Sequence, residues 1–209
     1  MKKRGNKTKS PIDTSLYEKR LIENGTRLIA GVDEVGRGSL AGPVLAAAVI
    51  LAHPCNIDGI TDSKKLSKNE RERLAEEISK VAVSIGFGIV DHSSIDRINI
   101  LNAALNAMSE AVLNLATVPE FVLVDGNYTL PIDIPQLAIP HGDSLSISIA
   151  AASILAKVKR DKMMEELELE YPQFSFSSHK GYGTKQHLAE IAKYGPSKIH
   201  RMTFRGVCK

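Results

Sequence analysis

The amino-acid sequence predicts an α/β protein with one mixed β-sheet and helices packed against it. Three strand-like runs follow one another early in the chain, and helices and strands alternate after them, a pattern typical of a mixed sheet flanked by helices. The length of 209 residues, 43% of them hydrophobic, is enough for one sizeable core and short for two independent domains. We therefore expect a single globular domain with at most a small appendage at its C-terminal end.

The elements of the first half are indicated by apolar runs and by the residues that interrupt them. Gly25 ends a short helical pattern, and a glycine-rich turn separates the first two apolar runs, as in a β-hairpin. Ser67 and Glu70 have the spacing of a capping box, which begins a charged helix. We expect a helix at 16–23, strands at 28–32 and 44–51, a helix from Ser67 to about Lys80, and a strand at 81–90.

The second half alternates between the two periodicities. Leucine, methionine and valine recur at helical spacing between 99 and 115, whereas two later apolar runs are short enough for strands. Alanines favour one long helix that Pro172 would stop, and Gly195 ends another. We expect a helix at 99–115, strands at 121–124 and 136–139, and helices at about 145–170 and 185–193.

The charged residues are distributed unevenly, although the net charge is only +3. Residues 1–10 contain five basic residues and no acid, residues 180–209 contain seven basic residues and one acid, and the segment between them therefore carries −8. The polar, basic segment 1–13 is predicted to be disordered. Basic ends on an acidic body suit an enzyme that gathers carboxylates at a metal site and grips a polyanion, but charge runs are also common on ordinary solvated surface.

The apolar runs and the cysteines of the sequence indicate the cellular compartment of the protein. No apolar run reaches the roughly 18 residues that a membrane span needs, and no apolar segment follows the basic N-terminus as in a signal peptide. The two cysteines, Cys55 and Cys208, are too far apart in the chain to suggest a disulfide framework or a cysteine-rich zinc site. We expect a cytoplasmic protein that has no membrane partner.

Four acids are candidate metal ligands because they stand where predicted strands or loops end near glycine: Asp33 and Glu34 before Gly36, Asp125 before Gly126, and Asp143 after Gly142. Hard divalent cations such as Mg²⁺ prefer carboxylate oxygens. Consecutive strand residues point to opposite faces, so Asp33 and Glu34 can share a site only if the chain turns at Glu34, which the glycines after it permit. Taken singly, Asp125 and Asp143 could instead belong to ordinary turns.

The glycine-rich segment after these first two acids does not match a dinucleotide-binding loop. Gly36, Gly38 and Gly42 lack the G-x-G-x-x-G spacing, and a strand follows them where that motif requires a helix. The Walker A and H-E-x-x-H patterns are absent, and Cys55 and the six histidines form no evident nucleophile–base arrangement. The glycines would instead present backbone N–H groups, with Arg37 among them, to a ligand that approaches closely.

Five motifs, in this order, resemble bacterial ribonuclease HII over roughly residues 28–205. They are GVDEVGRG at 31–38, DSKKLS at 62–67, VDG at 124–126, GDS at 142–144 with AAASILAKV at 150–158, and HKGYGT at 179–184. Val35 stands where that family commonly has alanine, a small departure. The resemblance implies a ribonuclease H-like fold with a mixed five-stranded sheet and flanking helices. We expect a catalytic domain at 14–183 and a short C-terminal helical extension at 184–209.

The resemblance also implies functional roles for ten residues. Four acids match the family's ligands for Mg²⁺ or Mn²⁺: Asp33, Glu34, Asp125 and Asp143. Six residues match nucleic-acid contacts: Gly36, Arg37, Gly38, Lys64, Lys180 and Tyr182. The first three of these match the segment that reads the 2′-hydroxyl, and Tyr182 matches the aromatic residue that stacks on the sugar beyond an RNA-to-DNA junction. Without the resemblance, Tyr182 would be a loop aromatic, and Lys64 and Lys180 would be solvated surface charges.

The activity that the resemblance implies is endonucleolytic cleavage of the RNA strand in RNA/DNA hybrids, and cleavage 5′ to single ribonucleotides in duplex DNA, as in ribonucleotide excision repair. Two metal ions would assist the hydrolysis, leaving 3′-hydroxyl and 5′-phosphate ends, in a monomeric enzyme. Two other classes stay open. A nucleic-acid-binding module with an inactive site would not need four acids, and a metal-dependent phosphatase for small molecules would not need basic ends or Arg37.

Overall fold

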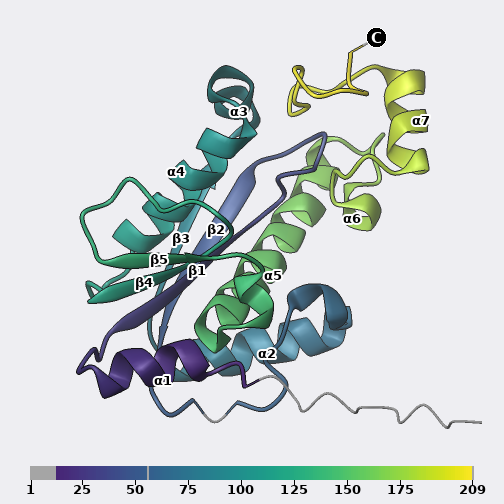
Figure 1. Cartoon of the computed structure of the whole chain (residues 1–209). Helices are drawn as coiled ribbons and strands as arrows, with labels where there is room; N and C mark the ends of the chain where they lie inside the picture. Colours follow the sequence, from purple (N-terminus) through teal and green to yellow (C-terminus); the bar gives the residue numbers. More distant parts are fainter. Residues whose placement is uncertain (1–12, 56, 209) are drawn as a thin grey trace, which may run out of the picture.

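The computed structural model describes residues 13–55 and 57–208, and residues 1–12 of the segment predicted to be disordered lie outside them. Its elements follow one another (Figure 1) as α1 (Leu16–Glu23), β1 (Ile29–Val35), β2 (Val44–Leu51), η1 (Ser63–Lys65), α2 (Lys68–Val81), β3 (Ala82–Val90), α3 (His92–Ile98), α4 (Ile100–Leu113), β4 (Phe121–Asp125), β5 (Gln136–Ile139), η2 (Gly142–Ser144), α5 (Ile147–Glu170), α6 (Phe176–His179) and α7 (Lys185–Tyr194).

The five predicted strands and the five predicted helices are all present, most with bounds within two residues of the prediction. The capping box at the start of α2 is confirmed, because Ser67 accepts from the backbone of Glu70 and Glu70 reaches back to the backbone of Ser67. Four short helical elements, α3, α6, η1 and η2, were not predicted, since three to seven residues carry too little periodic signal. The largest correction concerns β1, which runs three residues beyond its predicted end at Val32.

The sheet has the order β3-β2-β1-β4-β5, with β1 at its centre. β1 and β2 form the predicted antiparallel hairpin, and β2 pairs antiparallel with β3. On its other side β1 pairs in parallel with β4, and β4 with β5. The mixed five-stranded sheet expected from the sequence is therefore confirmed.

Helices cover both faces of the sheet, with α4 on one and α2 and α5 on the other (Figure 1). Small residues allow these helices to approach the strands closely. A Cβ on Gly88 would lie 2.0 Å from a backbone oxygen of α4, and a Cβ on Gly31 would lie 2.1 Å from the carbonyl carbon of Ser148 in α5. The position of α5 over β1 is thus fixed by direct contact of backbone with backbone.

The C-terminal part of the chain packs against the loop 36–43, which joins β1 to β2. Leu40 donates its N–H to the carbonyl of Gly181 at 2.7 Å and accepts from the N–H of Arg201 at 2.8 Å. The loop therefore lies between two segments that are distant in sequence. The domain boundary expected at 183/184 stays a prediction. Among the described residues, no helix has the length and apolar character needed to cross a membrane.

Candidate active site

Asp33 and Asp125 lie side by side because of the register of two parallel strands. The last β1–β4 pair is Val32 with Val124, so the next residue on each strand is an aspartate. Residues at equivalent positions of neighbouring parallel strands point to the same face, here the face that α5 covers. Sequence position alone therefore brings two carboxylates together at the carboxyl ends of β1 and β4.

Glu34 joins these two aspartates although it follows Asp33 within the same strand. Carboxylate oxygens of Asp33, Glu34 and Asp125 all lie within 4.8 Å of one another. The turn expected at Glu34 is absent: β1 continues to Val35, and the turn comes at Gly36, which has φ +90°. The parallel pairing with β4 stops at Val32, so the longer glutamate side chain can reach past the free edge of β1 to the shared site.

Asp143 lies next to this group but outside the three that share the 4.8 Å limit. The loop that carries it is tied to Asp125, whose Oδ1 accepts N–H groups from Gly142 at 2.7 Å and from Asp143 at 3.3 Å. The carboxylate of Asp143 is paired with Lys64, at 3.3 Å between Nζ and Oδ2. All four predicted acids are thus neighbours, with one of them neutralised by a lysine.

The electrostatics of the cluster favour an added cation. Burial, followed by the charges of Glu34 and Asp125, raises the pKa of Asp33 well above its usual range, and Asp33 is only 5% exposed. Burial and the charge of Asp143 likewise raise the pKa of Asp125. Several carboxylates that disfavour one another's charge in a shared, partly buried space form the kind of oxygen-rich site that a hard divalent cation stabilises.

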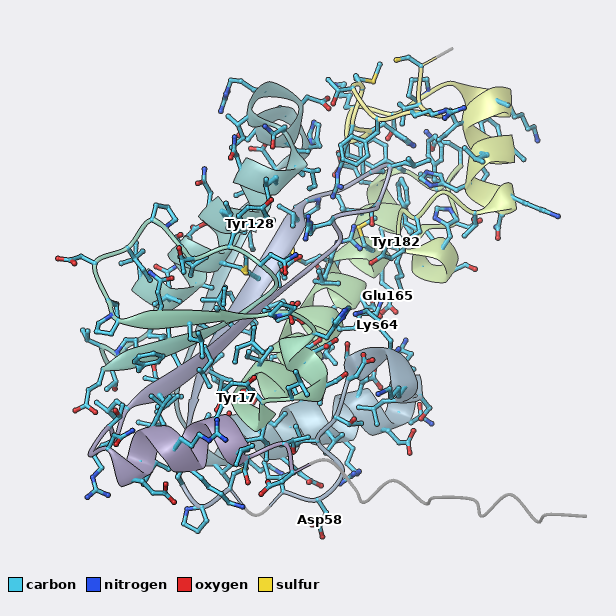
Figure 2. The ribbon with its side chains drawn as sticks, in the orientation of Figure 1. Tyr17, Asp58, Lys64, Tyr128, Glu165 and Tyr182 are labelled. Atoms are coloured by element: carbon cyan, nitrogen blue, oxygen red, sulfur yellow. The ribbon has the colours of Figure 1, made fainter. Side chains whose placement is uncertain are left out.

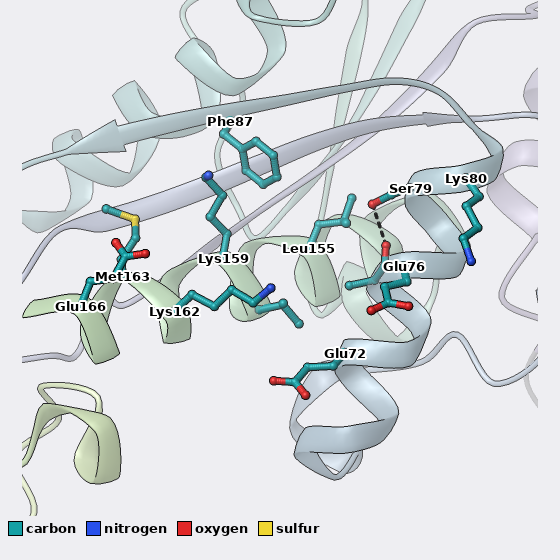
Figure 3. A pocket seen from close by; sticks show the side chains of 12 residues that line it. Glu72, Glu76, Ser79, Lys80, Phe87, Leu155, Lys159, Lys162, Met163 and Glu166 are labelled. Atoms are coloured by element: carbon teal, nitrogen blue, oxygen red, sulfur yellow. Dashed lines mark hydrogen bonds between the residues drawn. The ribbon is translucent and has the colours of Figure 1, made fainter.

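A cleft of about 370 Å³ opens beside these acids. Its lining joins residues from five parts of the chain: Asp33, Glu34, Val35, Ser63, Lys64, Arg71, Ser153, Lys157 and Tyr182. A larger hollow of about 840 Å³ lies elsewhere, between α2, α5 and β3 (Figure 3). That hollow carries three glutamates and three lysines on its walls and none of the predicted site residues. We take the smaller cleft as the candidate site because Asp33 and Glu34 of the carboxylate cluster line it.

Two buried arginines support the glycine-rich loop from beneath. Arg160 of α5 donates to the carbonyls of Pro43 at 3.0 Å and Ala41 at 3.3 Å, and Arg201 donates to those of Gly42 at 3.0 Å and Arg37 at 2.9 Å. Both side chains have no exposed surface, and neither pairs with a carboxylate in the described part of the chain. Their charges are held by neutral carbonyls, so the loop above them lies in a positive field.

The loop itself presents the three residues predicted to read the ribose. Gly36 must be glycine, because φ is positive there and a Cβ would lie 2.2 Å from Nε of Arg160. Gly38 has no other atom near the position of a Cβ, so its surroundings are open. Arg37 is half exposed and pairs with Glu34 at 3.1 Å between Nη1 and Oε1, which joins the loop to the acid cluster.

Two of the three remaining predicted contacts, Lys64 and Tyr182, lie on the same side of α5 (Figure 2). Tyr182 and Lys64 line the cleft with the acids, and the Lys64 side chain is 80% exposed. Lys180 does not line it: its ammonium is held by Glu165 at 2.8 Å, and its side chain is only 12% exposed. The structure therefore gathers nine of the ten predicted residues around the cleft and its loop, and it turns the charge of Lys180 toward α5.

Sequence reasoning did not assign a role to three basic residues that the structure brings to the site. Lys157 lines the cleft, with Nζ 5.9 Å from the centre of the Tyr182 ring, and Arg160 and Arg201 hold the loop. Lys157 and Arg160 lie on one face of α5 with Ser153, a spacing of four and three residues that could have suggested a shared surface. Arg201 gave no such signal, because its partners are more than 150 positions away.

Comparison with known proteins gives a consistent result. A family model described as Ribonuclease HII matches residues 30–207. A protein from Geobacter metallireducens named Ribonuclease HII is 55% identical over 191 residues, which cover 91% of this chain and 90% of that protein.

Solved structures are similar to the fold as well. The crystal structure of ribonuclease H2 from Pyrococcus horikoshii aligns with a TM-score of 0.71 at 26% identity, covering 86% of this chain and 94% of that one. The ribonuclease HII in the structure of the PCNA:RNase HII complex from Archaeoglobus fulgidus aligns with a TM-score of 0.71 at 29% identity, covering 85% and 95%.

Proposed function

The chain belongs to the ribonuclease HII family, and from this we propose that it cuts the RNA strand of RNA/DNA hybrids and cuts duplex DNA on the 5′ side of single embedded ribonucleotides. The products carry 3′-hydroxyl and 5′-phosphate ends. The enzyme acts as a cytoplasmic monomer, with residues 14–183 as its catalytic domain and 184–209 as a helical extension. One observation carries this function: Asp33 and Glu34, two of the three mutually close carboxylates, line a cleft that Tyr182 also lines.

The donor set of the cleft suits Mg²⁺ or Mn²⁺, because it consists of carboxylate oxygens whose charges are poorly compensated. Asp33, Glu34 and Asp125 would hold the metal, with Asp143 completing the set. When bound, such ions supply a water of lowered pKa and stabilise charge on the leaving oxygen. Lys64, now paired with Asp143, is free enough at 80% side-chain exposure to exchange that partner for a phosphate of the substrate.

Recognition of the substrate is assigned to the loop and to Tyr182. Gly36 and Gly38 leave the backbone open to a close ligand, and N–H groups in such a loop can donate to phosphate or to a 2′-hydroxyl. Arg37, already beside Glu34, adds a cation next to the carboxylates. Base sequence should matter little, because a 2′-hydroxyl and the shape of the minor groove are common to all RNA-containing duplexes.

Incubation of the protein and Mg²⁺ with a duplex that contains one ribonucleotide tests this function directly. We expect one cut, 5′ to the ribonucleotide, and no cut in the all-DNA duplex of the same sequence. Binding without cleavage would instead indicate a module with an inactive site. Release of phosphate from small esters, with the duplex left intact, would indicate a phosphatase.

Metal binding is expected to raise thermal stability in the absence of nucleic acid. A ligand at about 100 times its Kd stabilises the folded state by about 2.7 kcal/mol. For a protein of this size, each kcal/mol shifts Tm by about 2–4 °C, so saturating Mg²⁺ or Mn²⁺ should raise Tm by about 5–10 °C. The measurement is calorimetry with and without the metal, with NaCl at equal ionic strength as control. An unchanged Tm with both metals would argue against the assigned site.

Tyr182→Ala is expected to reduce cleavage of the single-ribonucleotide duplex by about tenfold and cleavage of continuous RNA/DNA less, because aromatic stacking on a nucleotide is worth about 1–3 kcal/mol. A ring that stacks on a deoxyribose distinguishes the junction, since a 2′-hydroxyl would crowd its face. The readout is the ratio of the two rates at fixed salt and Mg²⁺. Tyr182→Phe, the matched control, should keep most of the ratio, and an unchanged ratio in the alanine variant would exclude Tyr182 from reading the junction.

A further inference from the structure

Three buried histidines form a cluster directly behind Tyr182. His179 ends α6, His187 lies in α7 and His200 follows α7, and their exposed fractions are 6%, 0% and 1%. They pack with a pair of stacked phenylalanines, so none of the three is placed to react with a substrate. The function proposed above does not use them.

The position of each proton on two of these rings is fixed by backbone groups. Nδ1 of His187 lies 3.0 Å from the carbonyl of Tyr182, and a carbonyl only accepts, so this nitrogen carries a proton. Nδ1 of His200 accepts the backbone N–H of Ser197 at 2.9 Å, so it carries none. The two Nε2 atoms lie 3.0 Å apart, and neutral His200 therefore donates its Nε2–H to His187. The result is a one-directional chain of hydrogen bonds from one loop backbone to another.

The third histidine supports this pair from the side. His179 accepts the N–H of Gly181 on Nδ1 at 3.2 Å, so its Nε2 donates to Glu190, which lies at 2.9 Å. Its ring stacks on that of His187, with 4.2 Å between centroids and 13° between planes. The stacking restricts rotation of the His187 ring, which must keep Nδ1 toward Tyr182 for the chain to exist.

We propose that His187 and His200 are positioning residues that hold Tyr182 over the acid cleft through this proton-ordered pair. The inference rests on the proposed function, because it takes Tyr182 as the residue that contacts the substrate. Tyr182 and His200 are also anchored to the glycine-rich loop by isolated antiparallel β-bridges, which pair Ser39 with Tyr182 and Ala41 with His200. A single network therefore sets the position of the aromatic ring relative to the loop that reads the ribose.

The pair works only while both rings are neutral, since a second proton would place two N–H groups against each other across 3.0 Å. Burial lowers the pKa of His187, and burial with the neighbouring His187 lowers that of His200 to about 4. His179, Glu190 and, more distantly, His92 are the titratable groups that face them. Because both pKa values lie below the unfolded value, the stability they contribute is full above about pH 6.5 and is lost as the pH falls toward 4.

Long-range ¹H–¹⁵N NMR spectra of the imidazole rings test the proton arrangement without nucleic acid or metal. At pH 7.5 we expect a neutral His187 protonated on Nδ1, the less common tautomer, and a neutral His200 protonated on Nε2, which remains neutral at pH 5.5. Substitution of each residue by glutamine assigns the signals. A His187 ring protonated on Nε2, or a charged ring at pH 7.5, would overturn the proposal.

Two substitutions of His200 test the effect on cleavage. His200→Leu removes the donor, and we expect it to reduce cleavage of the single-ribonucleotide duplex by up to about tenfold and cleavage of the continuous hybrid less, as in Tyr182→Ala. His200→Gln keeps an N–H donor at the end of the side chain and should retain most of the ratio. His92→Gln, which removes a partly exposed histidine outside the pair, is the control.

The double variant Tyr182→Ala/His200→Leu separates positioning from general loss of structure. If His200 acts through Tyr182, the double variant loses no more of the ratio than either single variant. Additive losses, or equal losses on both duplexes, would overturn the proposal. A wild-type protein that cuts neither duplex would instead contradict the proposed function, and the NMR spectra would still decide whether the histidine pair exists.

Discussion

Asp125→Asn is expected to reduce cleavage at least about a hundredfold while leaving the fold intact. A metal ion in phosphoryl transfer supplies several kcal/mol of transition-state stabilisation, and each 1.36 kcal/mol is a factor of ten in rate. The substitution replaces one carboxylate oxygen with an amide nitrogen, which is a poor ligand for a hard cation. The other oxygen can still accept the N–H groups of Gly142 and Asp143, so the loop that carries Asp143 keeps its anchor.

The stability of this variant provides the internal control. Removal of one negative charge relieves the repulsion that raises the pKa of Asp33, so Tm without metal should stay equal or rise. The rise in Tm on addition of Mg²⁺ should shrink. Asp58→Asn, an exposed aspartate far from the cleft (Figure 2), should change neither property. Turnover close to that of the wild type would remove Asp125 from the metal site.

Gly31→Ala is expected to lower the free energy of unfolding by about 3 kcal/mol, at the upper end of the usual cost of overpacking. The new Cβ would lie 2.1 Å from the carbonyl carbon of Ser148 and 2.4 Å from the N atom of Ile149, and a helix backbone cannot rotate away as a side chain can. Either α5 or β1 must move. Because α5 also carries Ser153 into the cleft and β1 carries Asp33, cleavage should fall as well.

Chemical denaturation measures the predicted loss of stability. Gly38→Ala is the matched control, since a Cβ there meets no atom within 4 Å and the backbone is not in the left-handed region. It should change the free energy of unfolding by no more than about 0.5 kcal/mol. If both variants unfold at the same denaturant concentration, the backbone of α5 does not lie as close to Gly31 of β1 as the distance of 2.1 Å requires.

Local sequence patterns were sufficient for most of the fold. The hydrophobic runs of β1 and β2 and the alanine-rich stretch of α5 each have one consistent reading, and the predicted sheet was confirmed. The end of β1 was wrong because the glycines after Glu34 suggested an early turn. Strand length there is decided by pairing with β2, which continues to Val35 opposite Leu45, and pairing partners are not readable from a single run.

The candidate site likewise contains residues that the sequence could identify and residues that it could not. The acids could be named because short motifs carry them, and their metal role stays a prediction. Asp33 and Glu34 were expected to point to opposite faces of the sheet, as consecutive strand residues do in its middle. They share a site because the pairing of β1 with β4 ends at Val32, just before them. Arg201 and His200 could not be found in this way. Arg201 binds the backbone of a loop 164 positions away, and His200 pairs with the ring of His187, 13 positions away in another element, and no local pattern encodes either contact.

The dependence of the glycine-rich loop on Arg201 also has a consequence for the order of events on the ribosome. Arg201 follows Arg37, whose carbonyl it holds, by 164 positions. At about 5–20 residues per second, synthesis of that interval takes on the order of ten seconds or more. The strands that carry Asp33 and Asp125 are made before the guanidinium that fixes the loop beside them. We therefore expect a nascent chain to complete the strands that carry its carboxylates before the glycine-rich loop beside them is fixed in place.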